Sequence, residues 1–229
     1  MKKTLFALFL FISLIMNVFS QETVNEQPLK NATDSLSYCF GILIGNNMMV
    51  QGVKEVNENL FMMGFHNSYA NKESLVSIEV ANQVVQDYFN KQISEEANMN
   101  LQKSTEFLAE NQAREGVVTL PSGLQYEIIT PGTGEFPKAT DQVRVHYHGT
   151  FMDGNVFDSS IERNEPIVFG VDQVIPGWTE GLQLMQPGAK WMLYIPPALA
   201  YGEKGAGGVI GPNQALIFEV QLIEIVKGE

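Results

Sequence analysis

Hydrophobic and polar positions divide the chain into three regions with different periods. Residues 33–76 are apolar over more than one helical face, and residues 77–115 carry a helical stripe that thins beyond Ile93. Residues 116–229 alternate between apolar and polar positions, as strands do. The pattern predicts an α+β protein: an all-α domain with a long spacer helix, then a curved antiparallel β-sheet wrapped on a short helix.

The first region, residues 33–76, is expected to hold two helices. Thr33 or Asp34 would cap the first, which ends near Gly52, and Asn57 would cap the second. Because so short a segment cannot bury that much apolar surface alone, we expect it to be a dimerisation domain that meets a second copy of the chain. The alternative is that the pair folds back on the rest of its own chain.

A third and longer helix is expected to begin at Ser77 and to stop at Gly116. With no proline before Pro121, it can run to about Arg114 and reach roughly 55 Å. We interpret residues 77–115 as a connecting helix. A disordered linker is the alternative.

The last region, residues 116–229, reads as short strands between turns rich in glycine and proline. The hairpin turn Met152–Asn155 joins two of these strands. The strands are expected at residues 124–130, 143–149, 156–159, 167–170, 191–195 and 215–225.

The stretch Val174–Met185 predicts the one short helix of this region. Pro176 suits a first helical turn, after which Trp178, Leu182 and Met185 lie on one side. The tryptophan would then form the floor of an apolar cleft, with the β-branched residues that begin the stretch at its rim. The alternative is that the tryptophan is only the largest core residue.

The first twenty residues have the features of a secretory signal peptide. Two lysines precede an apolar run, and small residues allow cleavage after Ser20. An uncleaved anchor is the alternative, although the run is short for a membrane span. Residues 21–32 are polar and aperiodic, which is typical of a flexible leader. We therefore expect an exported protein without stable membrane insertion after cleavage, in the periplasm or else at the cell surface or secreted.

Charge and cysteine content narrow the possible partners. The formal net charge is −12, from 14 basic and 26 acidic residues, and loss of Lys2 and Lys3 leaves 12 basic residues and a charge of −14. Without a basic stripe, nucleic acid is not an expected partner. The single cysteine, Cys39, cannot form an internal disulfide, and we expect it to be a small buried residue.

Familiar catalytic and cofactor motifs do not emerge from the sequence. His146 and His148 share a strand face, but no further ligand accompanies them, so neither a metal nor a cofactor is expected. The glycines in residues 202–211 follow a Pro-Pro turn and precede a strand, so they do not match a nucleotide-binding loop, which joins a strand to a helix.

Candidate pocket residues are mostly aromatic or aliphatic, with one carboxylate and two phenols. Such a set binds a compact apolar group and orients it with a few hydrogen bonds. Asp158 has an equally good alternative role in capping backbone N–H groups of its turn. The set is Tyr147, Phe157, Asp158, Val174, Ile175, Trp178, Tyr201 and Phe218.

Six motifs lie along the last region of the chain. They are Val145-His146-Tyr147 with Gly149, Asp153-Gly154, Val156-Phe157-Asp158-Ser159-Ser160, Val174-Ile175-Pro176-Gly177-Trp178 with Glu180-Gly181, Ala200-Tyr201-Gly202 and Leu216-Ile217-Phe218-Glu219-Val220. Through these motifs, residues 121–227 resemble the FKBP-type peptidyl-prolyl cis-trans isomerase domain. The order of signal peptide, apolar helical pair and long helix resembles the macrophage infectivity potentiator branch of that family, which forms dimers.

The resemblance implies an enzyme that accelerates X-Pro bond rotation without covalent chemistry, by desolvation in an aromatic pocket. Its partners would be proline-containing unfolded or nascent exported proteins, and it would be a homodimer through its N-terminal helices. A dimeric chaperone with incidental isomerase activity is the alternative. The implied catalytic residues are Tyr147, Phe157, Asp158, Ile175, Trp178, Tyr201 and Phe218, and the implied substrate-binding residues are Val174, Arg163, Ile167, Ala206 and Ile210.

Individual roles also follow from the resemblance. Trp178 would be the floor, Tyr201 a hydrogen-bond donor, and the Ile175 N–H a donor to the bound carbonyl. Arg163 would pair with the pocket aspartate. Two positions depart from common family members, since Ile167 replaces an aromatic residue and Ala206 a histidine. We expect both to affect substrate preference more than activity.

Overall fold

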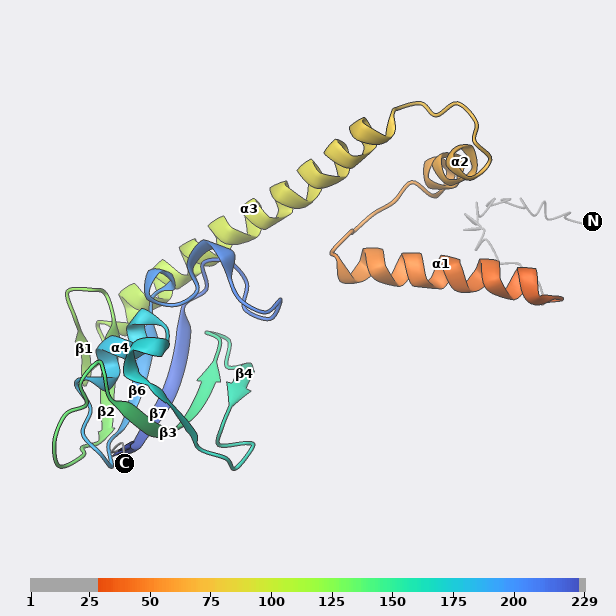
Figure 1. Ribbon diagram of the computed structural model, residues 1–229. Coiled ribbons are helices and arrows are strands. Elements are labelled where there is room, and N and C mark those ends of the chain that lie inside the picture. The colour runs from red at the N-terminus through yellow and green to blue at the C-terminus, as the bar shows by residue number, and fades with distance from the viewer. Residues whose placement is uncertain (1–28, 227–229) are drawn as a thin grey trace, which may run out of the picture. The chain divides into compact units, whose positions relative to one another are not determined.

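The computed structural model describes residues 29–226 (Figure 1), so the predicted signal peptide and most of the predicted leader lie outside the described residues. The described residues divide into two compact units, with the boundary between residues 75 and 76. In the described part of the chain, no helix has both the length and the hydropathy that a membrane span requires.

The first unit contains helices α1 (Ala32–Val50) and α2 (Glu58–Tyr69). Asn57 caps α2 by accepting a hydrogen bond from a backbone N–H, as predicted. The predicted cap of α1 was wrong: Asn31 caps it, with its side chain accepting from the N–H of Asp34. Asparagine and aspartate cap equally well, and Asn31 has the extended backbone that a cap needs, so the helix begins earlier.

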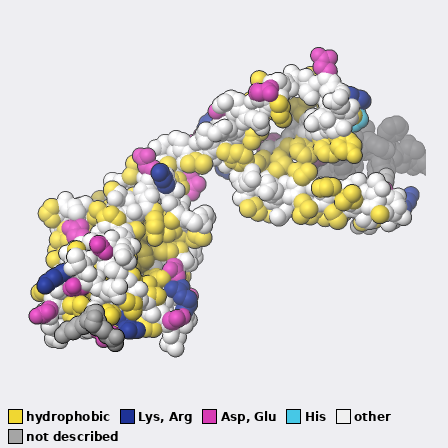
Figure 2. All heavy atoms as spheres, in the orientation of Figure 1, with side chains coloured by type: hydrophobic (Ala, Val, Ile, Leu, Met, Phe, Trp, Pro, Cys, Tyr) yellow, Lys and Arg dark blue, Asp and Glu magenta, His cyan; other side chains and the backbone are white. Residues whose placement is uncertain are grey.

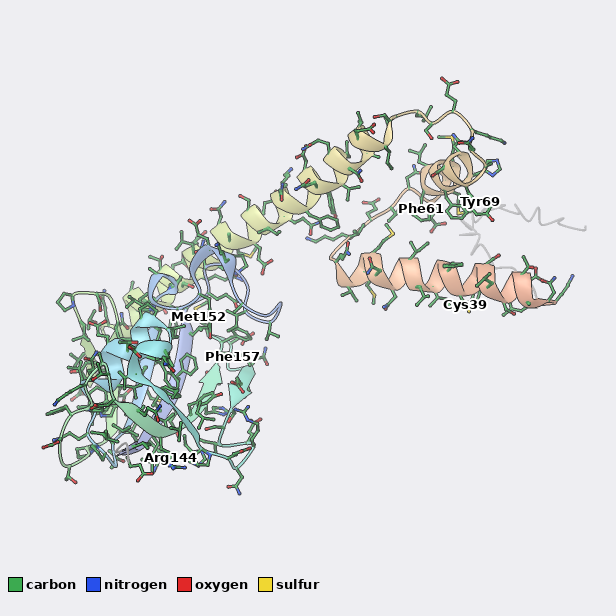
Figure 3. All side chains as sticks on the ribbon, in the orientation of Figure 1. Cys39, Phe61, Tyr69, Arg144, Met152 and Phe157 are labelled. Carbon is green, nitrogen blue, oxygen red and sulfur yellow. The ribbon has the colours of Figure 1, made fainter. Side chains whose placement is uncertain are left out.

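Neither helix of the first unit buries a side chain within the described structure. Leu43 is 64% exposed and Tyr69 is 83% exposed, and Figure 2 shows hydrophobic side chains spread over this unit. Cys39 is exposed as well (Figure 3), which corrects the expectation that it is buried. Because the two helices form no core of their own, no side chain in the described part of this unit covers Cys39.

Helix α3 (Ile78–Asn111) opens the second unit, with Ser77 as its cap, as predicted. It is continuous, which excludes the disordered linker, but it ends before the predicted stop at Gly116. The side chain of Asn111 donates to Gln125 of the sheet at 2.8 Å, and residues 112–116 form turns. The helix therefore ends where the chain turns into the sheet, before it reaches the glycine.

The described strands of the second unit form one antiparallel sheet in the order β1-β2-β6-β7-β3-β4, and β5 pairs with the first half of β3. Strand β1 was not predicted, because three largely exposed residues show no alternation. The strands are β1 (Val117–Thr119), β2 (Gln125–Thr130), β3 (Gln142–Thr150), β4 (Val156–Ser159), β5 (Ile167–Gly170), β6 (Lys190–Ile195) and β7 (Leu216–Val226).

Helix α4 (Pro176–Leu182) lies against this sheet (Figure 1). A Cβ atom on Gly177 would lie 2.5 Å from Ile195 Cγ2, and one on Gly181 would lie 3.1 Å from Leu193 Cδ1. Glycine at both positions therefore lets the helix approach β6 closely. This approach holds the neighbouring side chain of Trp178 within the core of the domain.

Truncation of the α4 contact should unfold the domain more easily. Leu182 is fully buried, whereas Leu184 is 39% exposed. We expect Leu182→Ala to lower the free energy of unfolding by about 2–5 kcal/mol, and Leu184→Ala by less than about 1 kcal/mol. Urea unfolding followed by tryptophan fluorescence measures both, since both tryptophans lie in this unit. Equal losses would contradict the assignment of α4 to the core.

Candidate functional site

A pocket of about 470 Å³ opens in the second unit, and side-chain rings form most of its wall. Its residues come from β3, β4, β5, α4, β7 and the connections between them, so distant parts of the sequence meet here. The lining residues are Tyr147, Phe157, Asp158, Ile167, Phe169, Gln173, Val174, Ile175, Trp178, Tyr201 and Phe218.

Trp178 is the centre of the ring cluster. Its ring centroid lies 5.5 Å from that of Tyr147 and 5.1 Å from that of Phe218, with interplanar angles of 81° and 85°. Phe169 adds a tilted contact at 5.6 Å. The indole is 5% exposed yet lines the pocket, and its Nε1 atom has no hydrogen-bond partner among the described residues. Edge-to-face contacts of this kind hold the floor in one orientation.

Gly149 of β3 makes room for two further rings. It pairs with Phe218 of β7, and a Cβ atom on Gly149 would lie 2.7 Å from Phe157 Cζ and 2.9 Å from Phe218 Cε1. Those two rings meet edge to face at 5.4 Å. A side chain at this glycine would displace part of the pocket wall, so backbone space here determines the shape of the site.

Three polar side chains form a network at the pocket. The Tyr147 hydroxyl and the Arg163 guanidinium both donate to the Asp158 carboxylate, and Arg163 Nη2 also donates to the Tyr147 hydroxyl at 3.0 Å. The Asp158 carboxylate therefore accepts hydrogen bonds from two side chains, in addition to lying beside the turn where it was an alternative cap. The network orients the Tyr147 ring from its polar end, while Trp178 contacts the ring itself.

The network shifts the pKa values of its members in opposite directions. Burial raises the pKa of Asp158, but the hydrogen bonds from Tyr147 and Arg163 outweigh burial, so the pKa falls below its usual value. Burial, and then the bond to Asp158, raise the pKa of the Tyr147 phenol. At neutral pH the pocket thus holds an ionised carboxylate and a protonated phenol.

Two hydrogen-bond donors remain available at the pocket. The Ile175 N–H, at the start of α4, donates to no group among residues 29–226. The Tyr201 hydroxyl also donates to none of them, and the Tyr201 residue is 41% exposed. Val174 precedes the first donor and lines the same wall. A carbonyl oxygen entering the pocket would find these two donors unoccupied.

The structure brings most of the predicted site residues together, and Arg163 adjoins them through its two hydrogen bonds. Ala206 and Ile210 lie elsewhere: they are hydrogen-bonded to each other and line a separate hollow of about 340 Å³ with Ile93 of α3. Two lining residues, Phe169 and Gln173, were not predicted from the sequence. Phe169 stands two positions after Ile167 on one strand, a spacing that could have identified it, whereas Gln173 is the last residue of the 3₁₀ turn Val171–Gln173 and gave no signal.

The two histidines of β3 contact hydroxyl groups. His146 Nδ1 lies 3.1 Å from Ser160 Oγ, and His148 Nδ1 lies 2.9 Å from Ser159 Oγ. In the described part of the chain, no three side chains of the metal-binding types gather closely enough to hold an ion.

Comparisons with known proteins agree over almost the whole chain. Residues 133–223 match a family model described as FKBP-type peptidyl-prolyl cis-trans isomerase, and residues 33–128 match one described as the domain amino terminal to it. The peptidyl-prolyl cis-trans isomerase Mip of Coxiella burnetii is 40% identical, over 98% of this chain and 99% of the relative. The outer membrane protein MIP of Legionella longbeachae is 41% identical, over 85% and 86%.

A solved structure supports the same relationship. The crystal structure of FkpA from Escherichia coli superposes with a TM-score of 0.70 at 34% identity, and the match covers 86% of this chain and 98% of that one. The matched region of the isomerase family model contains every residue that lines the pocket.

The lowered pKa of Asp158 gives a testable dependence on Arg163. Arg163→Gln should raise the pKa of Asp158 towards the usual carboxyl value of about 3.9, because it removes a charged side-chain donor that lowers this pKa. Titration of the Asp158 carboxyl carbon by NMR measures the shift. The lowered pKa also fixes how the free energy of unfolding depends on pH. The contribution of the ionised Asp158 is present above about pH 4 and is lost as the pH falls through the pKa of Asp158 in the folded protein.

Arg144→Gln is the matched control for that titration. Arg144 pairs with Glu224, near the opposite end of β3 from Phe157 (Figure 3), so its removal should leave the pKa of Asp158 unchanged. An Asp158 pKa that does not move in Arg163→Gln, or that moves equally in both variants, would contradict the network described above.

Proposed function

The chain belongs to the FKBP-type peptidyl-prolyl cis-trans isomerase family and is a peptidyl-prolyl cis-trans isomerase, and from that premise we propose that the pocket above Trp178 is where it rotates X-Pro bonds of exported proteins. One observation carries this proposal. The pocket of about 470 Å³ has rings on its floor and walls, with two free donors at its edge. Its shape and composition suit a prolyl ring and the carbonyl group before it.

Rotation about an X-Pro bond needs no covalent step. The barrier of about 18–20 kcal/mol comes from the partial double bond, and resonance places negative charge on the carbonyl oxygen, where water stabilises it. At the twisted transition state the resonance is lost and the dipole falls. A pocket that excludes water therefore disfavours the planar ground state relative to the twisted one.

Each part of the pocket has a place in this mechanism. The Trp178 indole would support the face of the prolyl ring, and the surrounding rings would keep water out. The Ile175 N–H and the Tyr201 hydroxyl would donate to carbonyl oxygens of the bound segment. Asp158 and Arg163, through Tyr147, would hold one wall of the pocket in position. Val174 and Ile167 would complete the apolar surface around the prolyl ring.

The required acceleration is within reach of such contacts. Uncatalysed exchange takes tens to hundreds of seconds, and an ordinary enzyme turns over about 1–10³ times per second. The pocket must therefore lower the barrier by roughly 3–7 kcal/mol. Desolvation and one or two well-placed hydrogen bonds supply energies of that order.

The helical unit supports a second element of the proposal, a homodimer. Helices α1 and α2 leave nearly all of their large apolar side chains exposed, including Leu43 and also Phe61, which Figure 3 labels. Exposed apolar surface of this extent is typical of a protein interface. A second copy of the chain is the proposed partner, because it would bring an identical set of exposed apolar helices to a symmetric interface.

A dimeric chaperone that holds unfolded exported clients is the second candidate function. The same exposed apolar helices favour it, and two linked sites would raise the effective concentration of a client segment at each pocket. The two functions are compatible, because peptide isomerisation uses the pocket, whereas holding a client would use both copies.

Substitution of the pocket floor tests the isomerase site. Trp178→Ala should lower kcat/KM for a short proline peptide by roughly 10- to 100-fold, because the support of the prolyl ring is lost. Trp191→Phe is the matched control. That tryptophan stacks on Tyr126 at 4.5 Å and does not line the pocket, so its variant should keep kcat/KM within about twofold while folded. Native activity in folded Trp178→Ala protein would exclude this site.

The mass of the chain without residues 1–20 tests the dimer. We expect sedimentation equilibrium to give twice the mass of one chain. Leu43→Glu should shift the measured mass towards that of a single chain, because a carboxylate buried at the interface opposes association. Ser37→Glu is the control, since it adds the same charge at a polar position of α1. Peptide turnover should survive in all three proteins, while protection of an unfolded client falls only in Leu43→Glu. A native protein of single-chain mass would contradict the dimer.

A further inference from the structure

Residues 199–215, which we call the flap, carry Tyr201 into the pocket wall and then cross to α3. The flap contains the 3₁₀ turn Gly202–Lys204 and one isolated bridge, and it lacks a strand or α-helix. Several of its glycines have positive φ values, including 62° at Gly205 and 59° at Gly207. A segment with so little regular structure needs outside contacts to hold one conformation.

Helix α3 supplies those contacts through hydrogen bonds. Ser104 Oγ donates to the Asn213 carbonyl at 3.0 Å and accepts from the Ala215 N–H at 2.8 Å. One turn earlier, Asn100 Nδ2 donates to the Pro212 carbonyl at 2.9 Å. Ser104 is fully buried, so its two bonds are shielded from water. The C-terminal part of the flap is thus fixed to α3 at three backbone groups.

These contacts reach the pocket through one further hydrogen bond. The Asn213 N–H donates to the Gly202 carbonyl at 2.8 Å, and Gly202 directly follows Tyr201. Asn213 has a φ of 54°, a conformation that asparagine tolerates better than most residues. The path from Ser104 to the backbone beside Tyr201 is therefore two consecutive hydrogen bonds.

Composition of the buried face of α3 indicates a role beyond docking. The buried residues of this helix are Asn100, Ser104 and Asn111, all polar. Alanine would favour the helix more, and an apolar face would dock it without the need to satisfy buried hydrogen bonds. Hydrogen bonds, in contrast to apolar contacts, fix a backbone in position and direction.

We propose that Ser104, assisted by Asn100, is a positioning residue of the isomerase: from α3 it holds the flap so that the Tyr201 hydroxyl meets the bound peptide. The proposal rests on the proposed role of the Trp178 pocket. Helix α3 would then be part of the enzyme as well as a connector. Loss of the contact between Ser104 and the flap would leave the pocket intact but would misplace the Tyr201 hydroxyl.

Steady-state kinetics of the full chain on a short proline peptide test the proposal. Ser104→Ala should lower kcat/KM roughly 3- to 10-fold, because a misplaced donor stabilises the transition state less. Asn111→Ala is the matched control: Asn111 is a buried polar residue of the same helix, but it bonds Gln125 of β2 rather than the flap. It should keep kcat/KM within about twofold at temperatures where both variants are folded.

A double-mutant cycle separates positioning from general destabilisation. In a Tyr201→Phe background the hydroxyl is already absent, so Ser104→Ala should change kcat/KM by less than about twofold. An equal loss with and without the hydroxyl, native kcat/KM in Ser104→Ala, or an equal loss in Asn111→Ala would each overturn the proposal. If Ser104→Ala does not fold, Asn100→Ala takes its place, with the Pro212 carbonyl as its one flap contact.

Failure of this proposal can be told apart from failure of the proposed site. If Trp178→Ala impairs turnover while Ser104→Ala does not, the pocket stands and only the positioning role is excluded. If Trp178→Ala and Tyr201→Phe both leave turnover at its native value, the pocket itself is excluded as the site, and the role of Ser104 with it.

Discussion

The close approach of α4 to β6 is the constraint on which the rest of the second unit depends. Gly177 and Gly181 bring the helix against Ile195 and Leu193, at distances that a Cβ atom would not permit without a shift. This approach fixes the position of Trp178 relative to the sheet, and the rings of Tyr147, Phe169 and Phe218 pack against its indole. A larger residue on that helix face would displace the floor and change the shape of the pocket.

The charged and polar groups of this site mainly stabilise the structure of the pocket wall. The shifted pKa values of Asp158 and Tyr147 keep one group charged and the other neutral, so that a stable network holds a wall of the pocket. No proton needs to move for an imide to twist. The pocket contributes an environment that excludes water and a set of placed hydrogen-bond donors, which suits a rotation that needs no covalent step.

Periodicity and turn chemistry predicted much of the second unit, since the strands and α4 follow alternation and the Pro-Gly turn. They failed where no period exists: β1 is three residues long, and Asn31 competes with nearby residues of equal capping strength. Eight pocket residues were candidates from their residue types alone, and the resemblance of the motifs added Ile167. The contacts of Ser104 with Asn213 and Ala215 span more than 100 positions, and nothing in the local sequence marks such a pair. Exposure of Cys39 depends on packing that α1 does not have within its own unit.

Exchange NMR of a short peptide with one X-Pro bond, recorded together with the two indole N–H signals of the protein, tests the central claim most directly. We expect cis-trans exchange of the peptide to accelerate while the Trp178 signal shifts with occupancy and the Trp191 signal stays in place. Accelerated exchange with an unmoved Trp178 signal would contradict it, because the bond would then be turning somewhere other than above that indole.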